Sequence, residues 1–599
     1  MIYHCEDHTC NYWDEGEKLP ERCPQCGRKL LRANEADMTG DDWTALGNTL
    51  WDAEASDKKR MVDCFRKAAY LGSAWGVCNL GICMEQGNGV EADPVQAFWL
   101  YQQAVEMGSL NAVCCLGVCY EYGIGTAPDA EKAAELYCKA AEYGSPRGQM
   151  LLARAFHDGI GVEADAAEAV YWVRAAAYQR YGEGMYRLGV CYEYGDGVEQ
   201  NWERAVHWFR EAAESGVGVA MTDLGYCYEK GCGVEQSWEQ AFSWYRRGAE
   251  CGYPVSMGNL GWCYKKGHGV EQNWQEAIKW YEQGAQCGDL QSMHNLACCY
   301  EGGEGVEQNE DRAFYWYRRS AEGGNGSAMC NLGRCYKRGY GVEQNWQEAV
   351  KWYEQGAQCG NLQSMHNLAC CYEHGEGVEQ NMTEAIRWYT AAAEGGNADD
   401  MYELGWQYDH GEGVEQDMKK AICWYERAAE QNHPAAMNSL GECYAMGRGV
   451  PRDLETAMEW YRRAAELGEA MADYNMGWHL EQAGKLSEAY THYRKAADGN
   501  DDSAWWALGR FYENGVVVAQ DGKEARRCYE TGEKLGSVKC KMRLARCKLL
   551  GIGGRRAKKA GLDLCRQALE LAKESSEKED YGYEAEMNLL RRTIAENES

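Results

Sequence analysis

A Leu-Gly or Leu-Ala dipeptide that recurs every 36 residues constrains the fold of this 599-residue chain more than any other feature. A unit this short cannot bury its apolar face alone, so neighbouring units must stack, and the period predicts a solenoid. Met476 continues the register, and Leu46, Leu508 and Leu544 extend it with small changes in spacing. The marker leucines at the strict period are Leu80, Leu116, Leu152, Leu188, Leu224, Leu260, Leu296, Leu332, Leu368, Leu404 and Leu440.

Each unit reads as two helices joined by a glycine turn. Apolar residues recur at three and four positions in segments such as 256–266, and Gly261 there lets the paired helix approach closely. A Gly-x-Gly-Val turn follows, as in 267–270, whose glycines can adopt the left-handed conformation that ends a helix. The second helix, such as 273–288, begins at an Asn, Asp or Ser that caps its free amides. The caps are Asp93, Asp129, Asp165, Asn201, Ser237, Asn273, Asn309, Asn345, Asn381, Asp417, Asp453 and Asp521.

These motifs, kept in one register, closely resemble the Sel-one-like repeat, a relative of the tetratricopeptide repeat, from about residue 39 to 572. The resemblance implies an all-α fold: a right-handed superhelical solenoid of about fourteen to fifteen helix-turn-helix repeats of 36 residues. We expect a zinc ribbon in 1–36, the solenoid in 37–572 and a C-terminal capping helix in 573–599. The unit around Met476 departs from the family pattern, since it lacks the glycine turn and shrinks to 32 residues.

Two repeats are nearly identical. Segment 273–309 and segment 345–381 lie 72 residues apart and differ at three positions, Ile278/Val350, Asp289/Asn361 and Gly302/His374. A block duplication explains this, so residues shared between the two reflect copying as readily as function.

Charge and hydropathy exclude several classes of protein. With 62 Lys and Arg against 93 Asp and Glu, the net charge of −31 argues against nucleic-acid or anionic-membrane binding and favours a cationic partner. No apolar run approaches the roughly 20 residues that span a bilayer. The N-terminal segment has no basic and apolar secretory pattern, so we expect a cytoplasmic protein with reduced thiols.

Four cysteines before the repeats have the spacing of a zinc ribbon. Cys5, Cys10, Cys23 and Cys26 form two Cys-containing turns, the second of them Cys-Pro-Gln-Cys-Gly, that would supply four thiolates to a tetrahedral structural zinc. Because the first turn is less typical, His4 or His8 remains an alternative ligand. A module of this size has too little core to fold without the metal.

The repeat cysteines are interpreted as small buried apolar residues. A cysteine in the same slot of the next repeat is too far away for a disulfide. The cysteine-rich secreted members of the family place disulfide cysteines eleven and three residues before the marker, but Met257 and Met293 stand three before it here. Ten cysteines share the slot three after the marker: Cys83, Cys119, Cys191, Cys227, Cys263, Cys299, Cys335, Cys371, Cys443 and Cys547.

Other patterns carry weaker chemistry. His294 with Cys298, and His366 with Cys370, place two ligand types one helical turn apart, but two ligands do not make a metal site. Between Lys534 and Lys559 stand ten basic residues and no acid, either a solvated cap that balances nearby carboxylates or a docking patch.

If the helices pair as in tetratricopeptide repeats, the residues two before, two after and five after each marker line the concave wall. Large varied side chains there suit binding anchors. The acids five after the marker favour a basic segment. The candidate partner-binding residues are Tyr186, Tyr226, Trp262, His294, Arg334, His366, Tyr402, Trp406 and Trp478.

The family resemblance implies a scaffold that binds another protein and is not an enzyme. The first alternative is a hydrolase, because some cysteine-rich relatives are linked to β-lactam binding or hydrolysis. The second is nucleic-acid binding through the zinc ribbon and the basic run. The oligomeric state is left open.

Overall fold

The computed structural model describes residues 2–5, 13–15, 30–33, 38–51, 55–578 and 584–598, and side chains within 38–51, 57–573 and 584–597. The chain divides into two compact units, 1–308 and 309–599. Unit 1 opens with strands β1 (Ile2–Cys5), β2 (Trp13–Glu15) and β3 (Leu30–Ala33). They form an antiparallel sheet in the order β2-β1-β3, in which Tyr3 pairs with Asp14 and Arg32.

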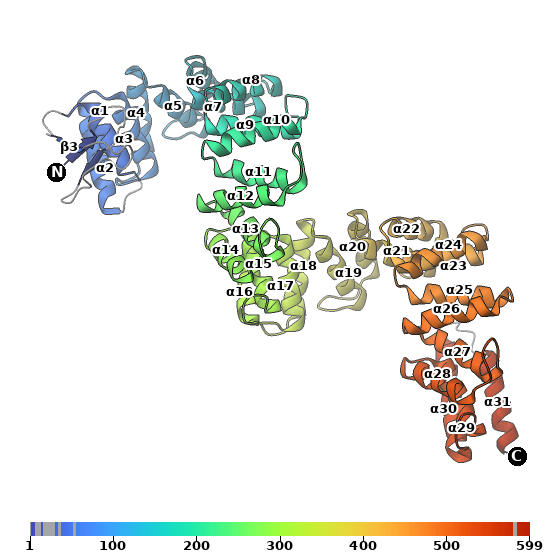
Figure 1. Cartoon of the computed structure of the whole chain (residues 1–599). Coiled ribbons are helices and arrows are strands. Elements are labelled where there is room, and N and C mark those ends of the chain that lie inside the picture. The colour runs from blue at the N-terminus through green and yellow to red at the C-terminus, as the bar shows by residue number, and fades with distance from the viewer. Residues whose placement is uncertain are drawn as a thin grey trace. The chain divides into compact units, whose positions relative to one another are not determined.

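The helices of unit 1 follow in antiparallel pairs (Figure 1). They are α1 (Gly40–Thr49), α2 (Ala55–Tyr70), α3 (Ala74–Gln86), α4 (Pro94–Glu106), α5 (Leu110–Tyr122), α6 (Ala130–Glu142), α7 (Pro146–Asp158), α8 (Ala166–Tyr178), α9 (Gly182–Tyr194), α10 (Trp202–Glu214), α11 (Gly218–Lys230), α12 (Trp238–Glu250), α13 (Pro254–Lys266), α14 (Trp274–Gln286) and α15 (Leu290–Gly302).

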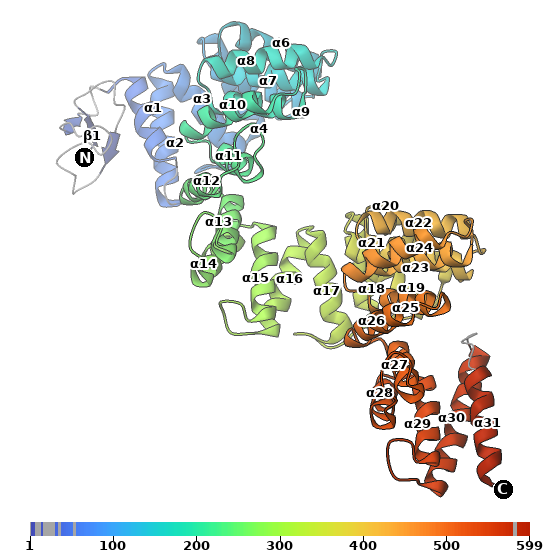
Figure 2. The ribbon, with the colours of Figure 1, turned by 45° about the vertical axis from the view of Figure 1, so that its right-hand side comes forward.

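Unit 2 continues the same arrangement (Figure 2). Its helices are α16 (Glu310–Glu322), α17 (Gly326–Arg338), α18 (Trp346–Gln358), α19 (Leu362–His374), α20 (Met382–Glu394), α21 (Ala398–His410), α22 (Met418–Glu430), α23 (Pro434–Met446), α24 (Leu454–Glu466), α25 (Ala470–Gln482), α26 (Leu486–Asp498), α27 (Asp502–Asn514), α28 (Gly522–Lys534), α29 (Val538–Leu550), α30 (Lys558–Lys578) and α31 (Glu584–Glu598).

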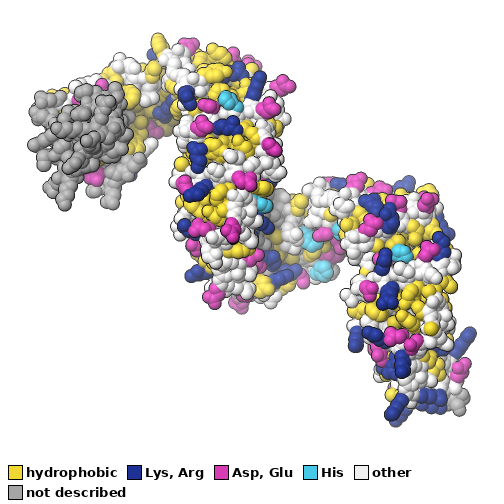
Figure 3. All heavy atoms as spheres, viewed as in Figure 1, with side chains coloured by type: hydrophobic (Ala, Val, Ile, Leu, Met, Phe, Trp, Pro, Cys, Tyr) yellow, Lys and Arg dark blue, Asp and Glu magenta, His cyan; other side chains and the backbone are white. Residues whose placement is uncertain are grey.

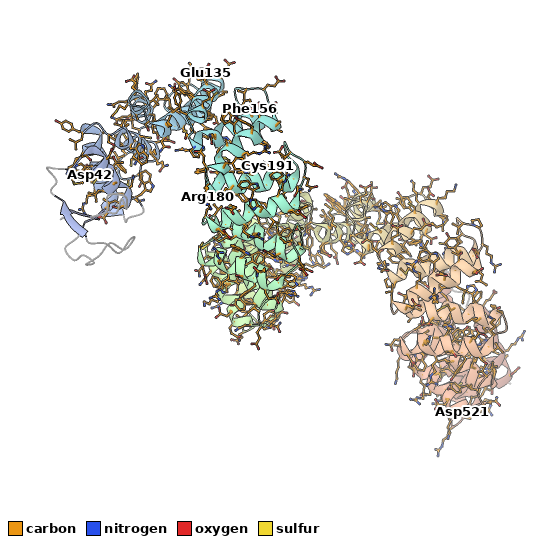
Figure 4. All side chains as sticks on the ribbon, turned by 45° about the horizontal axis from the view of Figure 1, so that its top comes forward. Asp42, Glu135, Phe156, Arg180, Cys191 and Asp521 are labelled. Atoms are coloured by element: carbon orange, nitrogen blue, oxygen red, sulfur yellow. The ribbon has the colours of Figure 1, made fainter. Side chains whose placement is uncertain are left out.

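Local rules set the ends of these helices as the repeat pattern predicts. All twelve predicted N-caps accept hydrogen bonds from backbone amides of their second helices, Asp521 (labelled in Figure 4) among them. Most first helices end at a left-handed glycine such as Gly267, at φ 74°, whereas α25, in the unit without the glycine turn, ends at Ala483. The prediction of helix-turn-helix units is confirmed. Helix α30 runs to Lys578, beyond the predicted boundary at residue 572.

The core of each repeat is an interlock between the marker dipeptide and one aromatic ring. Leu260 and Tyr281 are fully buried. A Cβ built on Gly261 would lie 2.7 Å from Cε1 of Tyr281, so the glycine makes the space that the ring fills. The ring stands 21 residues after the marker in most repeats, and the equivalent rings include Tyr101, Tyr137, Phe209, Tyr245, Tyr353, Tyr425, Tyr461 and Tyr529.

Consecutive first helices also pack against one another, as α5 does against α7 and α17 against α19. This contact places the first helices of each unit on one continuous side, which we call the first-helix wall. It consists of the residues two before, two after and five after each marker, because these positions share one face of a helix. Nine of the ten cysteines in the shared slot are buried behind this wall, as predicted, and Cys191 is half-buried.

Candidate protein-binding wall

All nine predicted partner-binding residues lie on first helices. Tyr186, Tyr226, Trp262 and His294 belong to unit 1, and the other five belong to unit 2. Tyr226 and Trp478 are the most open, with exposed fractions of 45% and 38%, while the others are half-buried.

Several of these side chains are held by neighbours within the chain. Trp262 packs on His268 with ring centroids 4.9 Å apart, and Tyr402 stacks on His433 at 4.9 Å. Such contacts preorganise the rings and lower the entropy lost when a partner binds.

The acidic row five after the marker is tied to the core. The hydroxyl of Tyr245 donates to Oε2 of Glu229 at 2.9 Å, so a buried phenol receives its acceptor from the wall. The same bond recurs in other repeats, which explains why an acid recurs at this position. The further pairs are Tyr101 with Glu85, Tyr137 with Glu121, Tyr389 with Glu373, Tyr425 with Asp409, Tyr493 with Glu481 and Tyr529 with Glu513.

Some acids of the row also carry an arginine from the next repeat. Arg154, two after its marker, contacts Glu121 at 2.5 Å, and Arg510 contacts Glu481 at 2.8 Å. In these repeats the negative charge is already compensated. The row as a whole is therefore a structural element, and its capacity to attract a basic segment depends on which acids lack both partners.

One pocket lies where the core tyrosine is missing. Val173 takes the place of the ring and Ala153 the place of the glycine, and the wall there encloses a cavity of about 500 Å³. Its floor is apolar, with Met150, Val170 and Val190, and its rim is charged. Figure 4 labels Cys191, which also lines the cavity. We call this cavity the Val173 pocket. It is lined by Arg147, Met150, Leu151, Ala153, Arg154, His157, Asp158, Ala169, Val170, Val173, Tyr181, Glu183, Arg187, Val190, Cys191 and Asp196.

A second pocket of about 340 Å³ adjoins it through the shared residue Val190. Phe209 replaces the tyrosine here, so the core ring of this repeat has no hydroxyl to donate to Glu193, the acid of this repeat. Burial, and then the neighbouring Asp223, raises the pKa of Glu193. Burial likewise raises the pKa of Asp223, although a hydrogen bond from Tyr186 opposes the shift. We call this cavity the Glu193 pocket. It is lined by Tyr186, Val190, Glu193, Tyr194, Phe209, Asp223, Tyr226 and Cys227.

The structure thus brings two of the nine predicted residues, Tyr186 and Tyr226, into one pocket. The larger Val173 pocket beside it contains none of the nine. Its signal is visible in the sequence as the loss of an aromatic residue at a position that otherwise holds one in nearly every repeat. The varied side chain beneath the wall, and not the varied side chains on it, is the sequence feature that marks this pocket.

Three residues of the basic run near the C-terminus contact neighbouring helices. Arg543 contacts Glu513 at 3.4 Å and Glu586 at 2.7 Å, and Arg546 also contacts Glu513. Arg556 donates to Asn597 at 2.6 Å. These contacts hold α29 to α27 and α31, and they support a structural role for this part of the run. The surface around α29 to α31 still shows a gathering of basic side chains (Figure 3).

The predicted zinc ligands fall mostly outside the described residues. Cys5 is the last residue of β1, and Cys10, Cys23 and Cys26 are not described. Within the described part of the chain, no group of three or more His, Cys, Asp or Glu side chains is placed to hold a metal ion. Among the same residues, no helix is long and apolar enough to cross a membrane.

Comparison with known protein families finds the same repeats along the chain. The family pattern of the Sel1 repeat fits thirteen segments: 76–109, 112–145, 146–181, 182–217, 218–253, 254–289, 290–325, 326–361, 362–397, 398–433, 434–469, 470–501 and 504–537. The chain belongs to the Sel1 repeat family. The pairs α1–α2 and α29–α30 lie beyond the thirteen and extend the Sel1 solenoid at both ends.

Several solved structures are similar to the chain. A protective antigen present in uropathogenic Escherichia coli strains is 32% identical, with 75% of this chain and 97% of that one covered and a TM-score of 0.50. A Sel1 repeat protein from Oxalobacter formigenes is 33% identical, with coverage of 41% and 96% and a TM-score of 0.38. An immunity protein from Pseudomonas aeruginosa is 19% identical, with coverage of 36% and 81% and a TM-score of 0.27. No curated protein matches the sequence.

Proposed function

We propose that this Sel1 repeat protein is a non-catalytic scaffold that binds an extended or helical segment of another protein along the first-helix wall of unit 1. The observation that carries the proposal is the pair of adjoining pockets at Val173 and Glu193, formed where the core tyrosine is replaced. An apolar side chain of the partner would occupy the Val173 pocket, and a Lys or Arg next to it would occupy the Glu193 pocket.

The electrostatics support this division. Glu193 has neither a tyrosine hydroxyl nor an arginine from the next repeat, since Phe209 and Tyr226 stand at those positions. Burial raises the pKa of both carboxyls, and Asp223 raises that of Glu193 further, so a cationic side chain would stabilise their charged forms. The net charge of −31 would speed the approach of a basic segment, with most of the affinity coming from the buried contacts.

The test fills the Val173 pocket with the side chain that the other repeats use. The double variant Ala153→Gly, Val173→Tyr restores the glycine and tyrosine of the repeat pattern, so the fold should accept it. Displayed random peptides that are selected on the wild-type protein should bind this variant about 10 to 100 times more weakly, because burial of one apolar side chain is worth about 1.5–3 kcal/mol. Binding is measured by titration calorimetry, after circular dichroism confirms the fold.

The matched control is Tyr171→Ala, which removes an exposed aromatic side chain from α8 of the same repeat. It should leave peptide affinity unchanged. Peptides that bind the filled variant as tightly as the wild type would place the binding site away from this pocket. The selected peptides should also carry a basic residue, and their association should slow as salt concentration rises.

We also propose a structural zinc held by Cys5, Cys10, Cys23 and Cys26. The sheet supports this proposal, because β1 and β2 flank Cys10, and β2 and β3 flank the pair Cys23 and Cys26, as two metal-binding turns of a ribbon require. The metal would fix two turns of a module with very little core. The many thiols of the repeats fit a reducing compartment, and we propose a cytoplasmic location.

Chelation is expected to release one zinc per chain and to unfold the first 36 residues alone. Elemental analysis of the purified protein counts the metal, and proteolysis followed by mass spectrometry locates the unfolded segment. The variant Cys23→Ser, Cys26→Ser should contain less than half an equivalent of zinc, whereas Cys251→Ser, at an exposed repeat cysteine, should retain a full one. Full zinc content in the double variant would contradict the assignment.

A further inference from the structure

Unit 2 contains a line of three side chains that the scaffold does not require. His366 and Cys370 stand one turn apart on α19, and Nε2 of His366 lies 3.6 Å from Sγ of Cys370. On the other side of the ring, Nδ1 lies 2.7 Å from Oδ1 of Asp400, which α21 of the next repeat supplies. A thiol, an imidazole and a carboxylate are therefore aligned across two repeats, in the order that activates a cysteine as a nucleophile.

The carboxylate at the end of this line is deeply buried. Asp400 has no exposed surface, and among the described residues its Oδ2 has no hydrogen-bond partner. A buried carboxylate is costly unless a cation faces it, and His366 is the group in contact. Hydrogen bonding to Asp400, and then to Cys370, raises the pKa of His366 to about 10. The imidazole thus keeps both protons near neutral pH, and the proton on Nε2 points at sulfur.

The other groups around these three side chains do not compete with Cys370 for the Nε2 proton of His366. The hydroxyl of Tyr389, on α20, lies 3.4 Å from Sγ of Cys370 but 2.7 Å from Oε2 of Glu373, so its single proton goes to the carboxylate. The remaining titratable neighbours are Glu403 and Asp399 on α21, which add negative charge near His366, and Lys337 on α17, which faces Cys371 and pairs with Glu376 at 3.5 Å.

We propose that Cys370 is a nucleophilic modification site, with His366 and buried Asp400 as its positioning residues, and that its thiolate form exchanges with low-molecular-weight disulfides. The sulfur attacks one sulfur of the disulfide, whose S–S bond breaks as a new S–S bond forms to Cys370. The other half leaves as a thiolate and takes a proton from water. The site is half-buried on the first-helix wall, so a small adduct would change the surface that the wall presents.

The duplication supplies an internal control. Residues 290–301 and 362–373 have the same sequence, and Nε2 of His294 lies 3.8 Å from Sγ of Cys298, as in the second copy. The residue 34 positions after His366 is Asp400, but the residue 34 positions after His294 is Ala328. The two cysteines therefore share their local helix, and the aspartate that contacts His366 has an alanine as its counterpart in the first copy.

The experiment measures alkylation of the intact, reduced protein by a limiting amount of iodoacetamide between pH 6 and 8. Fragmentation of the two different tryptic peptides separates Cys370 from Cys298. Near pH 6.5, Cys370 should react about 10 times faster than Cys298, because an ordinary thiol is mostly protonated there. The rate at Cys298 should rise nearly tenfold per pH unit, while the rate at Cys370 stays almost flat. Glutathione disulfide should likewise add one glutathione at Cys370 first.

Variants then assign the cause. Asp400→Asn and His366→Gln should each bring Cys370 down to the rate and pH profile of Cys298, and Asp399→Asn, an exposed neighbour, should change neither. Labelling of Cys371, which is fully buried, reports whether a variant has opened locally. The comparison of Cys370 with Cys298 in the wild-type protein tests the proposal even if a variant opens locally. Parallel pH profiles at Cys370 and Cys298 would overturn the proposal, as would an Asp400→Asn protein that stays closed and reacts like the wild type.

Discussion

Replacing Glu513 by alanine is expected to lower the free energy of unfolding of the C-terminal repeats by about 3–5 kcal/mol, the usual result of removing one partner from a buried ion pair. Glu513 has an exposed side-chain fraction of only 9%, and Tyr529, Arg543 and Arg546 all contact it. The Nε atoms of both arginines already lack hydrogen-bond partners among the described residues. Without Glu513, Arg543 and Arg546 would remain buried, and one nearby carboxylate, Glu586, would remain for the two of them, in contact with Arg543.

The matched control removes the acid at the same position of another repeat, where no buried ion pair depends on it. Glu193→Ala should change stability by less than about 0.5 kcal/mol, because this residue has no tyrosine or arginine partner and burial already raises its pKa. Urea unfolding gives the free energies, and hydrogen exchange shows whether α27 to α29 open first. Equal losses in the two variants would contradict the structural role assigned to the acidic row.

Replacing Gly225 by valine is expected to destabilise its repeat by about 3 kcal/mol or more, at the upper end for overpacked cores. A Cβ at this position would lie 2.5 Å from Cε1 of Tyr245, and both Tyr245 and Leu224 are fully buried. The ring must move, and it would take with it the hydrogen bond to Glu229, worth about 1 kcal/mol more.

The chain itself supplies the comparison for this variant. Ala369 stands at the equivalent position beside Tyr389, which shows that one methyl group is accommodated. Gly225→Ala should therefore cost clearly less than Gly225→Val, with protection from hydrogen exchange lost mainly in α11 and α12. If the free energy of unfolding of the valine variant lies within about 0.5 kcal/mol of the wild-type value, the effect is no larger than that of an ordinary surface substitution. That result would refute the interlock.

Features that depend on one repeat were predictable from the sequence. The period, the N-caps such as Asn273, the left-handed glycines such as Gly267 and the close approach at Gly261 follow from rules that act within a few residues or one helix pair. The structure confirms each of them.

Features that depend on the offset between repeats were not. His366 and Asp400 stand 34 residues apart, and their contact follows from how α21 packs on α19. The bond from Tyr245 to Glu229 lies within one repeat, but it too was not predictable, because the sequence pattern does not show that the acid on the first helix reaches the ring on the second. The sequence pattern predicts a surface for capture at the acidic row, because the inward contacts of the acids leave no trace in a pattern of single residues.

The interlock between glycine and tyrosine has a consequence for how such proteins acquire new specificities. In most repeats a buried ring fills the space beside the glycine. At Val173 a single smaller side chain leaves a hollow with an apolar floor, while the glycine turns and caps of that repeat stay intact. A pocket in this architecture can thus arise from one smaller side chain at the ring position, and evolution or design could open any repeat that retains its ring in the same way.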